Sequence, residues 1–346
     1  MNAAMPMAAR DNHLWWQFSL KLGGLILLVL SGGTGGPKLL RGLLFQTTEP
    51  QITVIVNTGD DMWISGNLVC PDLDTVVYTI AGIVTERWWG IRDDTFKTYE
   101  ELLRRGHEES LIIGELDRAT HIMRTHLLCE GKTLTEATLN VCRSFAVSST
   151  VLPMTDDFVP TMIITEQGGM HIQDFLVTHE REPRVLQVKS KSGVMTLEVK
   201  AALGCNSSVI IGPSNPISSV GPILNVEGMR KALKERFVVA VSPIIRTGPV
   251  SGPAAQFMES QGLPVSSLGI AQYYEDFLDV LVVDTEDFDV KDRDLPGDIQ
   301  VVRTGTIMHG IEESKTLAAH VLEIINQNTA SDDHSPRGSS DKNKIK

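Results

Sequence analysis

The sequence predicts an α/β fold: a Rossmann-like, doubly wound, mainly parallel sheet with a helical insertion and a β-hairpin addition. Three observations predict it. Short aliphatic and β-branched runs recur along the chain, segments of helical periodicity separate them, and several runs end in turns rich in glycine and proline. Strands that alternate with helices pair in parallel, and a ligand then binds at the carboxyl edge of the sheet.

The first predicted strand covers residues 25–30, LILLVL, and stops at Ser31. Six apolar residues are too few for a membrane span and fit a buried central strand. A glycine turn, residues 32–36, comes next, and Pro37 suits the first turn of a helix. A strand, a glycine turn and a helix start together present free backbone N–H groups to an anion such as phosphate.

The motif itself is not specific. Lys38 stands where a dinucleotide fingerprint has its third small residue, and no G-K-[ST] follows, so neither the Rossmann nor the P-loop pattern is matched. Phosphate binding by Gly33, Thr34, Gly35 and Gly36 is preferred to a purely structural turn because of the strand-turn-helix context. Lys38 is either an anion ligand or a solvated helix residue.

The second predicted strand, residues 51–57, ends in Thr-Gly-Asp-Asp, and two more aspartates follow in PDLDT. The four carboxylates, Asp60, Asp61, Asp72 and Asp74, are expected in loops at the carboxyl edge of the sheet. Mg²⁺ prefers a few carboxylates together with water and substrate phosphate, so a metal site is predicted. Two alternatives remain: a ribose contact from the end of the strand, and simple capping of a helix at 75–83 by Asp72 and Asp74.

Residues from about 72 to 150 have helical periodicity without strong strands and are predicted to form a helical insertion that could cover a substrate. Trp88, Trp89 and Arg92 in this segment could offer an aromatic shelf to a flat ligand, although core packing explains the tryptophans equally well. His121 and His126 are five residues apart, which does not suit a zinc site on one helix face.

The remaining elements restore the α/β rhythm. A β-hairpin is predicted from residues 161–165 and 170–177, as a half-exposed addition at the edge of the core. Later strands are predicted at 208–211, 237–241, 278–283 and 299–302, with helices near 195–203, from 254 and at 312–327. The first of these strands runs into Ser214 and Asn215, which are candidate nucleotide contacts.

Composition limits the class of protein. A chain of 346 residues with 42% hydrophobic residues and a net charge of −12 is predicted to be a cytoplasmic protein without nucleic-acid or membrane partners. Four cysteines form no C-x-x-C pair and are expected to be reduced thiols. Residues 25–327 are expected to form one domain, after an extension at 1–24 and before a disordered tail at 328–346.

The chain resembles the 2-phospho-L-lactate transferase family of coenzyme F-420 biosynthesis. The likeness extends from about residue 25 to residue 287, with several blocks in the same order and spacing. They are SGGTGGPKLLRGL (31–43), VNTGDD (56–61), SGNLVCPDLDT (65–75), WWGIRDDTF (88–96), LDRATH (116–121), IIGPSNPISSVGPI (210–223) and AVSPIIRTGPVSGPA (240–254).

The resemblance implies Mg²⁺-dependent transfer of a 2-phospholactyl or enolpyruvyl phosphate group from a guanosine diphosphate-linked donor to the deazaflavin FO. The products would be coenzyme F-420-0 and GMP, and the enzyme would be a homodimer. Mapped onto this chain, the resemblance implies a diphosphate at residues 33–36 with Lys38, and a nucleotide at Ser214 and Asn215. Asp60, Asp61 and Asp74 would hold the metal, Asp61 or Asp74 would take the hydroxyl proton, and Asp74, Trp89 and Arg92 would bind FO.

Two other functions could use the same glycine turn. One is a regulatory nucleotide-sugar-binding protein similar to the YvcK-type gluconeogenesis factors, and the other is a nicotinamide-dependent oxidoreductase. The aspartates and the WWG segment favour the transferase over the first. The missing third glycine counts against the second.

Overall fold

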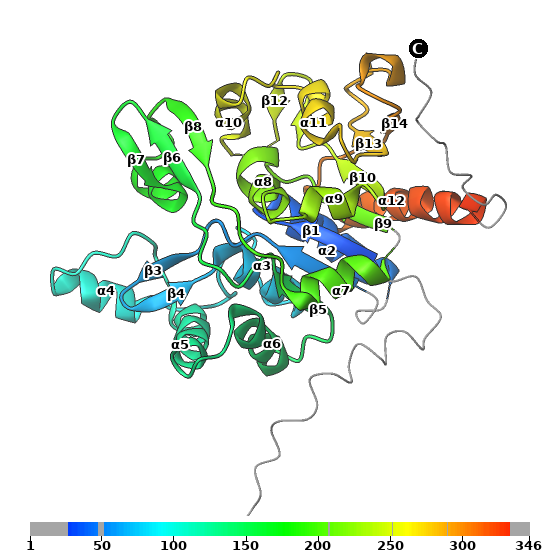
Figure 1. Ribbon diagram of the computed structural model, residues 1–346. Helices are drawn as coiled ribbons and strands as arrows, with labels where there is room; N and C mark the ends of the chain where they lie inside the picture. The colour runs from blue at the N-terminus through cyan, green and yellow to red at the C-terminus, as the bar shows by residue number, and fades with distance from the viewer. Residues whose placement is uncertain (1–26, 48–51, 207, 251, 289, 333–346) are drawn as a thin grey trace, which may run out of the picture.

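A computed structural model of the chain describes residues 27–47, 52–206, 208–250, 252–288 and 290–332. Its centre is a seven-stranded parallel sheet of order β14-β13-β10-β9-β1-β2-β5, so the predicted doubly wound α/β fold is confirmed (Figure 1). The strands are β1 (Leu27–Ser31), β2 (Ile52–Val56), β5 (Thr150–Pro153), β9 (Ser208–Ile211), β10 (Phe237–Val241), β13 (Val280–Val283) and β14 (Gln300–Arg303).

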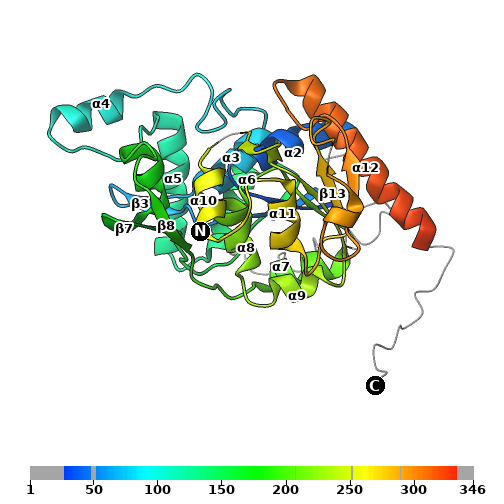
Figure 2. The ribbon, with the colours of Figure 1, turned by 90° about the horizontal axis from the view of Figure 1, so that it is seen from above.

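Successive side chains of each strand point to opposite faces of the sheet, and both faces are buried. On β1, Leu27 and Val29 face one core, while Leu28 and Leu30 face the other. The first core is closed by α2 (Gly35–Gln46), α3 (Pro71–Ile80), α6 (Leu134–Ser144) and α12 (Ile311–Asp332). The second is closed by α7 (Leu197–Cys205), α8 (Gly221–Leu224), α9 (Met229–Leu233), α10 (Ala254–Ser260) and α11 (Ser267–Tyr274). Figure 2 shows α2 and α12 on one side, with α7 and α9 on the other.

The strand order reverses its direction at β1. From β1 the chain passes to β2 and then β5 on one side, whereas β9, β10, β13 and β14 follow one another on the other side. Residues after β1 and β9 therefore leave the sheet side by side at the switch point, where open α/β sheets bind ligands.

The segment between β2 and β5 holds the predicted helical insertion. It contains α3, α4 (Lys97–Arg104), α5 (Glu115–Cys129) and α6, preceded by a short hairpin, β3 (Met62–Ile64) and β4 (Asn67–Val69), which was not predicted. The prediction of loop positions for Asp72 and Asp74 is wrong, because helix α3 starts at Pro71 and includes both. Proline at the first helical position and two acidic residues in the first turn stabilise this earlier start.

The predicted hairpin is present as β6 (Met162–Thr165) and β7 (Gly168–His171), and β8 (Val185–Lys189) adds a third strand. This antiparallel sheet, β7-β6-β8, is separate from the central sheet. The strand predicted at residues 170–177 of this hairpin is too long, because residues 174–178 form one turn of π-helix, η2 (Asp174–Thr178). The sequence prediction also placed residue 150 within the insertion, although Thr150 begins strand β5.

At the ends of the chain, α12 continues to Asp332, five residues into the predicted tail. The predicted extension at 1–24 and the rest of the tail lie outside the described residues. Within the described ranges, no helix combines the length and the apolar character that crossing a membrane requires.

Candidate functional site

The glycine turn meets the loop after β9 at the switch point. The Ser214 hydroxyl accepts a hydrogen bond from the Gly36 N–H at 3.0 Å and donates one to the Gly32 carbonyl at 2.6 Å. The two backbones are so close that a Cβ atom on Gly35 would lie 1.8 Å from the Pro213 carbonyl oxygen. Ser214 therefore joins the two loops.

Asn215, the other predicted nucleotide contact, caps the helical segment that follows. Its Oδ1 accepts hydrogen bonds from the N–H groups of Ile217 and Ser218 at the start of η3 (Pro216–Val220), a π-helical turn. This capping orients η3 so that Ser219 lies against the glycine turn, where its Oγ would be 2.9 Å from a Cβ on Gly33.

The glycine turn offers backbone donors at the start of α2. Within the described part of the chain, the N–H groups of Thr34 and Gly35 have no hydrogen-bond acceptor, whereas those of Gly33 and Gly36 are bonded to Asp72 and Ser214. Free N–H groups at the positive end of a helix dipole attract anions. The turn therefore keeps two free backbone donors at the start of α2, and phosphate binding by residues 33–36 stays a prediction.

A buried polar network lies directly beside this turn. The Asn57 carboxamide donates to Asp60 Oδ1 and to Asp72 Oδ2, both at 2.8 Å, and Gln173 Nε2 donates to Asp60 Oδ2 at 2.9 Å. The second oxygen of Asp72 accepts the Gly33 N–H at 2.8 Å.

Burial, and then the nearby charge of Asp72, raise the pKa of Asp60 well above its usual range. Burial likewise raises the pKa of Asp72 to about 6, although hydrogen bonds from Gly33 and Asn57 favour the carboxylate. The fold thus brings two carboxyl groups together, and no cationic side chain among the described residues forms an ion pair with either.

Asp61 continues the row of acidic groups. It is 2% exposed, and its Oδ1 has no hydrogen-bond partner among the described residues. Burial raises the pKa of Asp61 well above its usual range, although a hydrogen bond with the Cys70 thiol and the charge of Arg124 both act to lower it. An unpaired buried oxygen is costly, so Oδ1 of Asp61 is an acceptor that a ligand or a water molecule could use.

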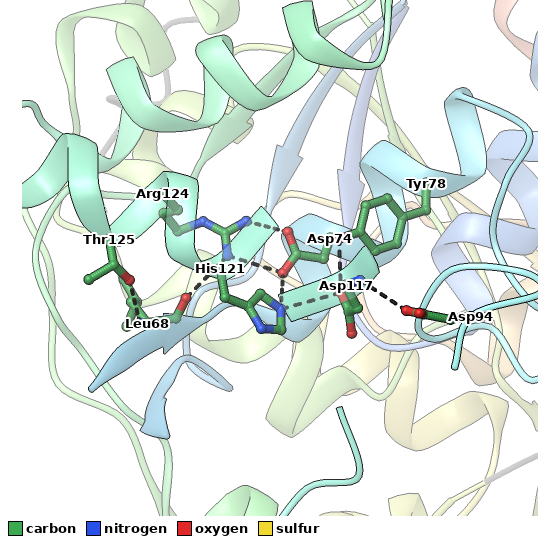
Figure 3. Close-up of polar contacts among 8 residues, drawn as sticks. All are labelled: Leu68, Asp74, Tyr78, Asp94, Asp117, His121, Arg124 and Thr125. Atoms are coloured by element: carbon green, nitrogen blue, oxygen red, sulfur yellow. Dashed lines mark hydrogen bonds and ion pairs between the residues drawn. The ribbon is translucent and has the colours of Figure 1, made fainter. Parts of the chain in front are cut away.

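Asp74, by contrast, is paired. Arg124 of α5 holds both oxygens of Asp74, with Nη1 at 3.1 Å from Oδ2 and Nη2 hydrogen-bonded to Oδ1 (Figure 3). His121 Nε2 lies 3.3 Å from Asp74 Oδ2 and 3.3 Å from Asp117 Oδ1.

These contacts set the charges of the cluster. Burial opposes ionisation of Asp74, but Arg124 and His121 outweigh it and lower the pKa of Asp74 to about 2. Burial also disfavours protonated His121, yet hydrogen bonds to Asp117 and Asp74 raise its pKa to about 9. At neutral pH ionised Asp74 therefore faces two cations, Arg124 and protonated His121.

Asp74, Asp117 and His121 also bring one possible ligand atom each to within 4.8 Å of one another. A metal ion bound there would have to displace the proton of His121, and it would compete with Arg124 for the oxygens of Asp74. Tyr78 also donates to Asp117 at 2.8 Å, and Asp94 accepts the N–H groups of Leu116 and Asp117 at the start of α5. These contacts fasten α5 to α3 (Figure 3), so we interpret the cluster as a structural link.

The predicted aromatic shelf is only partly arranged for a ligand. The ring of Trp88 lies 4.7 Å from the Arg41 guanidinium and 5.7 Å from Lys38 Nζ, so it packs on helix α2. Trp89 is 53% exposed and available to stack on a ligand. Arg92 donates to the Gly82 carbonyl at 3.0 Å and holds its own loop.

Lys38 lies on α2 beside Arg41. Burial, together with the charge of Arg41, lowers the pKa of Lys38. Among the ion pairs of the described residues, no carboxylate pairs with either side chain, so an external anion could supply the missing charge.

The structure thus links Asp60 to the glycine turn through Asn57 and Asp72, and Asp61 lies near enough to Arg124 to be influenced by its charge. The sequence analysis missed Asn57, Gln173 and Arg124. Asn57 is the last residue of the strand predicted at 51–57, and this position at the carboxyl edge of the sheet could have identified it as a site residue. Gln173 and Arg124 come from distant segments that carry no local motif.

Comparison with known proteins gives consistent results. A family model described as "2-phospho-L-lactate transferase CofD" matches residues 27–329. A 2-phospho-L-lactate transferase of Methanococcoides burtonii is 45% identical over 303 residues, which covers 86% of this chain and 99% of that protein. One of Methanocaldococcus jannaschii is 40% identical over 307 residues, covering 86% and 98%.

Two solved structures share the fold. Protein BH3568 of Bacillus halodurans superposes with a TM-score of 0.57 at 15% identity, covering 86% of this chain and all of that one. A second structure of the same protein, described as a member of the upf0052 family, gives a TM-score of 0.55 at 16% identity. At this level of identity the likeness concerns the fold alone.

Proposed function

Because the chain belongs to the 2-phospho-L-lactate transferase family, we propose that it transfers a 2-phospholactyl or enolpyruvyl phosphate group from a guanosine diphosphate-linked donor to the deazaflavin FO, releasing GMP. The observation that carries the proposal is the buried row Asp72, Asp60 and Asp61 beside a glycine turn at the switch point of the sheet. An anion-binding turn and a set of carboxylates are the two parts that transfer of a substituted phosphate needs.

The diphosphate of the donor would bind to the glycine turn. The free N–H groups of Thr34 and Gly35 and the dipole of α2 favour an anion there. Lys38, which lacks an acidic partner among the described ion pairs, would neutralise a further phosphate charge. These contacts would hold the scissile phosphate in place, and positioning supplies much of the rate in phosphoryl transfer.

The acidic residues fit a divalent cation. Asn57 Nδ2 holds one oxygen of Asp60 and one of Asp72 at 2.8 Å each, so two carboxylates converge, and oxygen ligands of this kind suit Mg²⁺. We propose that Asp60 and Asp72 hold the ion, with Asp61 adjacent. Bound Mg²⁺ would stabilise negative charge on the phosphates. Asp74 stays a predicted ligand, although its oxygens already face Arg124 and His121.

Asp61 is the better of the two predicted proton acceptors. The pKa of Asp61 is raised while that of Asp74 is lowered to about 2, so the carboxylate of Asp61 is the stronger base of the two. Asp61 also has the unpartnered Oδ1 with which to accept the hydroxyl proton of FO. FO binding by Asp74, Trp89 and Arg92 stays a prediction.

The test is a reconstituted reaction. Purified protein is incubated with FO and either guanosine diphosphate-linked lactate or the enolpyruvate analogue, with Mg²⁺ or EDTA, and products are separated by chromatography with fluorescence detection. We expect a phosphorylated deazaflavin and GMP in the presence of Mg²⁺. Asp61→Asn should lower kcat by about 10²–10⁴-fold, the usual contribution of a general base.

Asp292→Asn is the matched control, because Asp292 is exposed and accepts the N–H of Val301 in β14, at the far edge of the sheet. Its kcat should equal that of the wild type. Absence of product with both donors, together with tight binding of a nucleotide-sugar, would favour the regulatory alternative. Wild-type rates in folded Asp61→Asn would exclude Asp61 as the base.

A further inference from the structure

One N–H group of the glycine turn is already occupied by a side chain of the protein. Gly33 donates to Asp72 Oδ1 at 2.8 Å, and the other oxygen of Asp72 accepts from Asn57 at 2.8 Å. Asp72 is 6% exposed, so this contact lies inside the site and not on its rim. A donor phosphate cannot use the Gly33 N–H while the carboxylate holds it.

The occupied N–H group of Gly36 differs from that of Gly33. Its acceptor, the Ser214 hydroxyl, is neutral and is itself held by the Gly32 carbonyl at 2.6 Å, so it belongs to the framework of the turn. Asp72 is a carboxylate and adds negative charge where the donor's diphosphate would sit. Like charges in a buried site disfavour binding strongly.

The backbone of the turn is packed closely against η3. Gly33 has φ of +59°, and any Cβ at this position would be 2.9 Å from Ser219 Oγ. A Cβ on Gly32 would lie 2.8 Å from the Ser219 carbonyl oxygen, so η3 packs tightly on the turn. The side chain of Asp72, in the first turn of α3, is the part that can change its rotamer.

We propose that Asp72 couples the cation to the donor: its carboxylate blocks the Gly33 N–H in the metal-free protein and leaves it when a divalent cation binds beside Asp60. The released N–H then joins those of Thr34 and Gly35 as a third donor to the diphosphate. Asp72 is a positioning residue in this scheme, and it makes donor binding depend on prior binding of the cation. The inference rests on the proposed donor site.

The deciding measurement is the affinity for GDP in EDTA, by isothermal titration calorimetry. Asp72→Ala removes both the charge and the competing acceptor, so we expect it to bind GDP at least about tenfold more tightly than the wild type without metal, the effect of about one hydrogen bond to a charged group. Asp72→Asn keeps an acceptor but loses the charge, and it should be intermediate. Equal or weaker metal-free binding by Asp72→Ala, with the fold intact by thermal unfolding, would overturn the inference.

Mg²⁺ alone provides a second readout. In the ¹H–¹⁵N spectrum of the wild type, Mg²⁺ without nucleotide should shift the Gly33 amide resonance, because the N–H loses its carboxylate acceptor. In Asp72→Ala the Gly33 resonance should no longer respond to Mg²⁺. A resonance that does not respond in the wild type would also overturn the inference.

Asp292→Ala is the matched control, since it also removes a carboxylate that accepts one backbone N–H, and it should bind GDP in EDTA as the wild type does. If neither the wild type nor Asp72→Ala binds GDP even with Mg²⁺, the proposed donor site fails together with this inference. If the wild type binds GDP with Mg²⁺ and Asp72→Ala gains nothing in EDTA, the coupling alone fails.

Discussion

Arg124 is the largest fully buried side chain among the described residues, and its position explains much of the insertion. Its guanidinium holds Asp74 and also donates to the Leu68 carbonyl at 3.3 Å, so α5 is joined to α3 and to β4 at once. Burying a charge is costly unless it is paired, and here Asp74 accepts from both Nη atoms of Arg124, while its Nε has no hydrogen-bond partner among the described residues. The cluster therefore stabilises the insertion only at pH values at which Asp74 is ionised and His121 is protonated.

His121 gives this cluster a pH dependence. Its pKa is about 9 in the folded protein against about 6.5 in an unfolded chain, so the folded state binds the proton more tightly. The contribution to stability is complete below about pH 6.5 and is lost as the pH rises through 9. A shift of this size corresponds to a contribution on the order of 3 kcal/mol.

We therefore predict that His121→Gln lowers the free energy of unfolding at pH 6 and has a much smaller effect at pH 10. Urea unfolding of the wild type and the variant at the two pH values measures this. His126→Gln is the control, because the side chain of His126 is 69% exposed and pairs only with Glu130 among the described residues. Parallel pH profiles for wild type and His121→Gln would show that His121 is not charged in the fold.

At the scale of elements, the central feature is the contact between the glycine turn and the loop after β9. It requires glycine at particular positions because two backbones meet there. A Cβ on Gly35 would be 1.8 Å from the Pro213 carbonyl oxygen, and one on Gly212 would be 2.7 Å from the Cα of Gly36. These clashes involve backbone atoms, so no rotamer change relieves them.

Gly35→Ala should therefore separate the two loops, lower the melting temperature by several degrees and abolish GDP binding. Thermal unfolding and calorimetry measure both effects. Gly204→Ala is the matched control: Gly204 is in α7 with no heavy atom within 4 Å of its ideal Cβ position, and alanine there should stabilise by up to about 1 kcal/mol. Unchanged melting and GDP binding in Gly35→Ala would contradict the proposed rigidity of the turn.

The elements that sequence reasoning predicted well are those with strong local signals. The run before Ser31, the glycine turn and the start of α2 could be read directly, since apolar strands and glycine turns depend on neighbouring residues. Strand β5 was missed because it has four residues and ends at Pro153, which is a weak signal by itself. It is a strand because β2 supplies its hydrogen-bond partners.

The site was predictable in part for the same reason. Asp60 and Asp61 follow a strand and could be placed at the carboxyl edge of the sheet. Their partners could not, because Gln173 is 113 positions from Asp60 and Arg124 is 50 positions from Asp74. Residue type and spacing do not reveal which distant segment folds over a carboxylate, so tertiary packing decided these contacts.

At the scale of the whole molecule, three parts meet at one place. The sheet supplies the glycine turn and the aspartates after β2, the insertion supplies Arg124, and the three-stranded sheet supplies Gln173 through the segment after β7. Figure 1 shows the insertion and the three-stranded sheet as neighbouring projections from the central sheet. Movement of either projection would therefore change the hydrogen bonds of these carboxylates.

The insertion also carries exposed apolar side chains that the predicted homodimer could bury. On α5, Leu116 and Ile122 are each 53% exposed and Ile112, just before the helix, is 67% exposed. Burial of such side chains stabilises an interface at about 25 cal/mol per Å², so a second copy of the chain would gain by covering them.

We predict that the wild type sediments as a dimer at micromolar concentration and that Leu116→Glu/Ile122→Glu sediments as a monomer with an unchanged circular dichroism spectrum. Leu197→Glu is the control, since Leu197 is 78% exposed on α7, a helix on the other core of the sheet, and its charge should leave the dimer intact. A dimer that survives the double substitution would exclude α5 from the interface, and a monomeric wild type would exclude the homodimer itself.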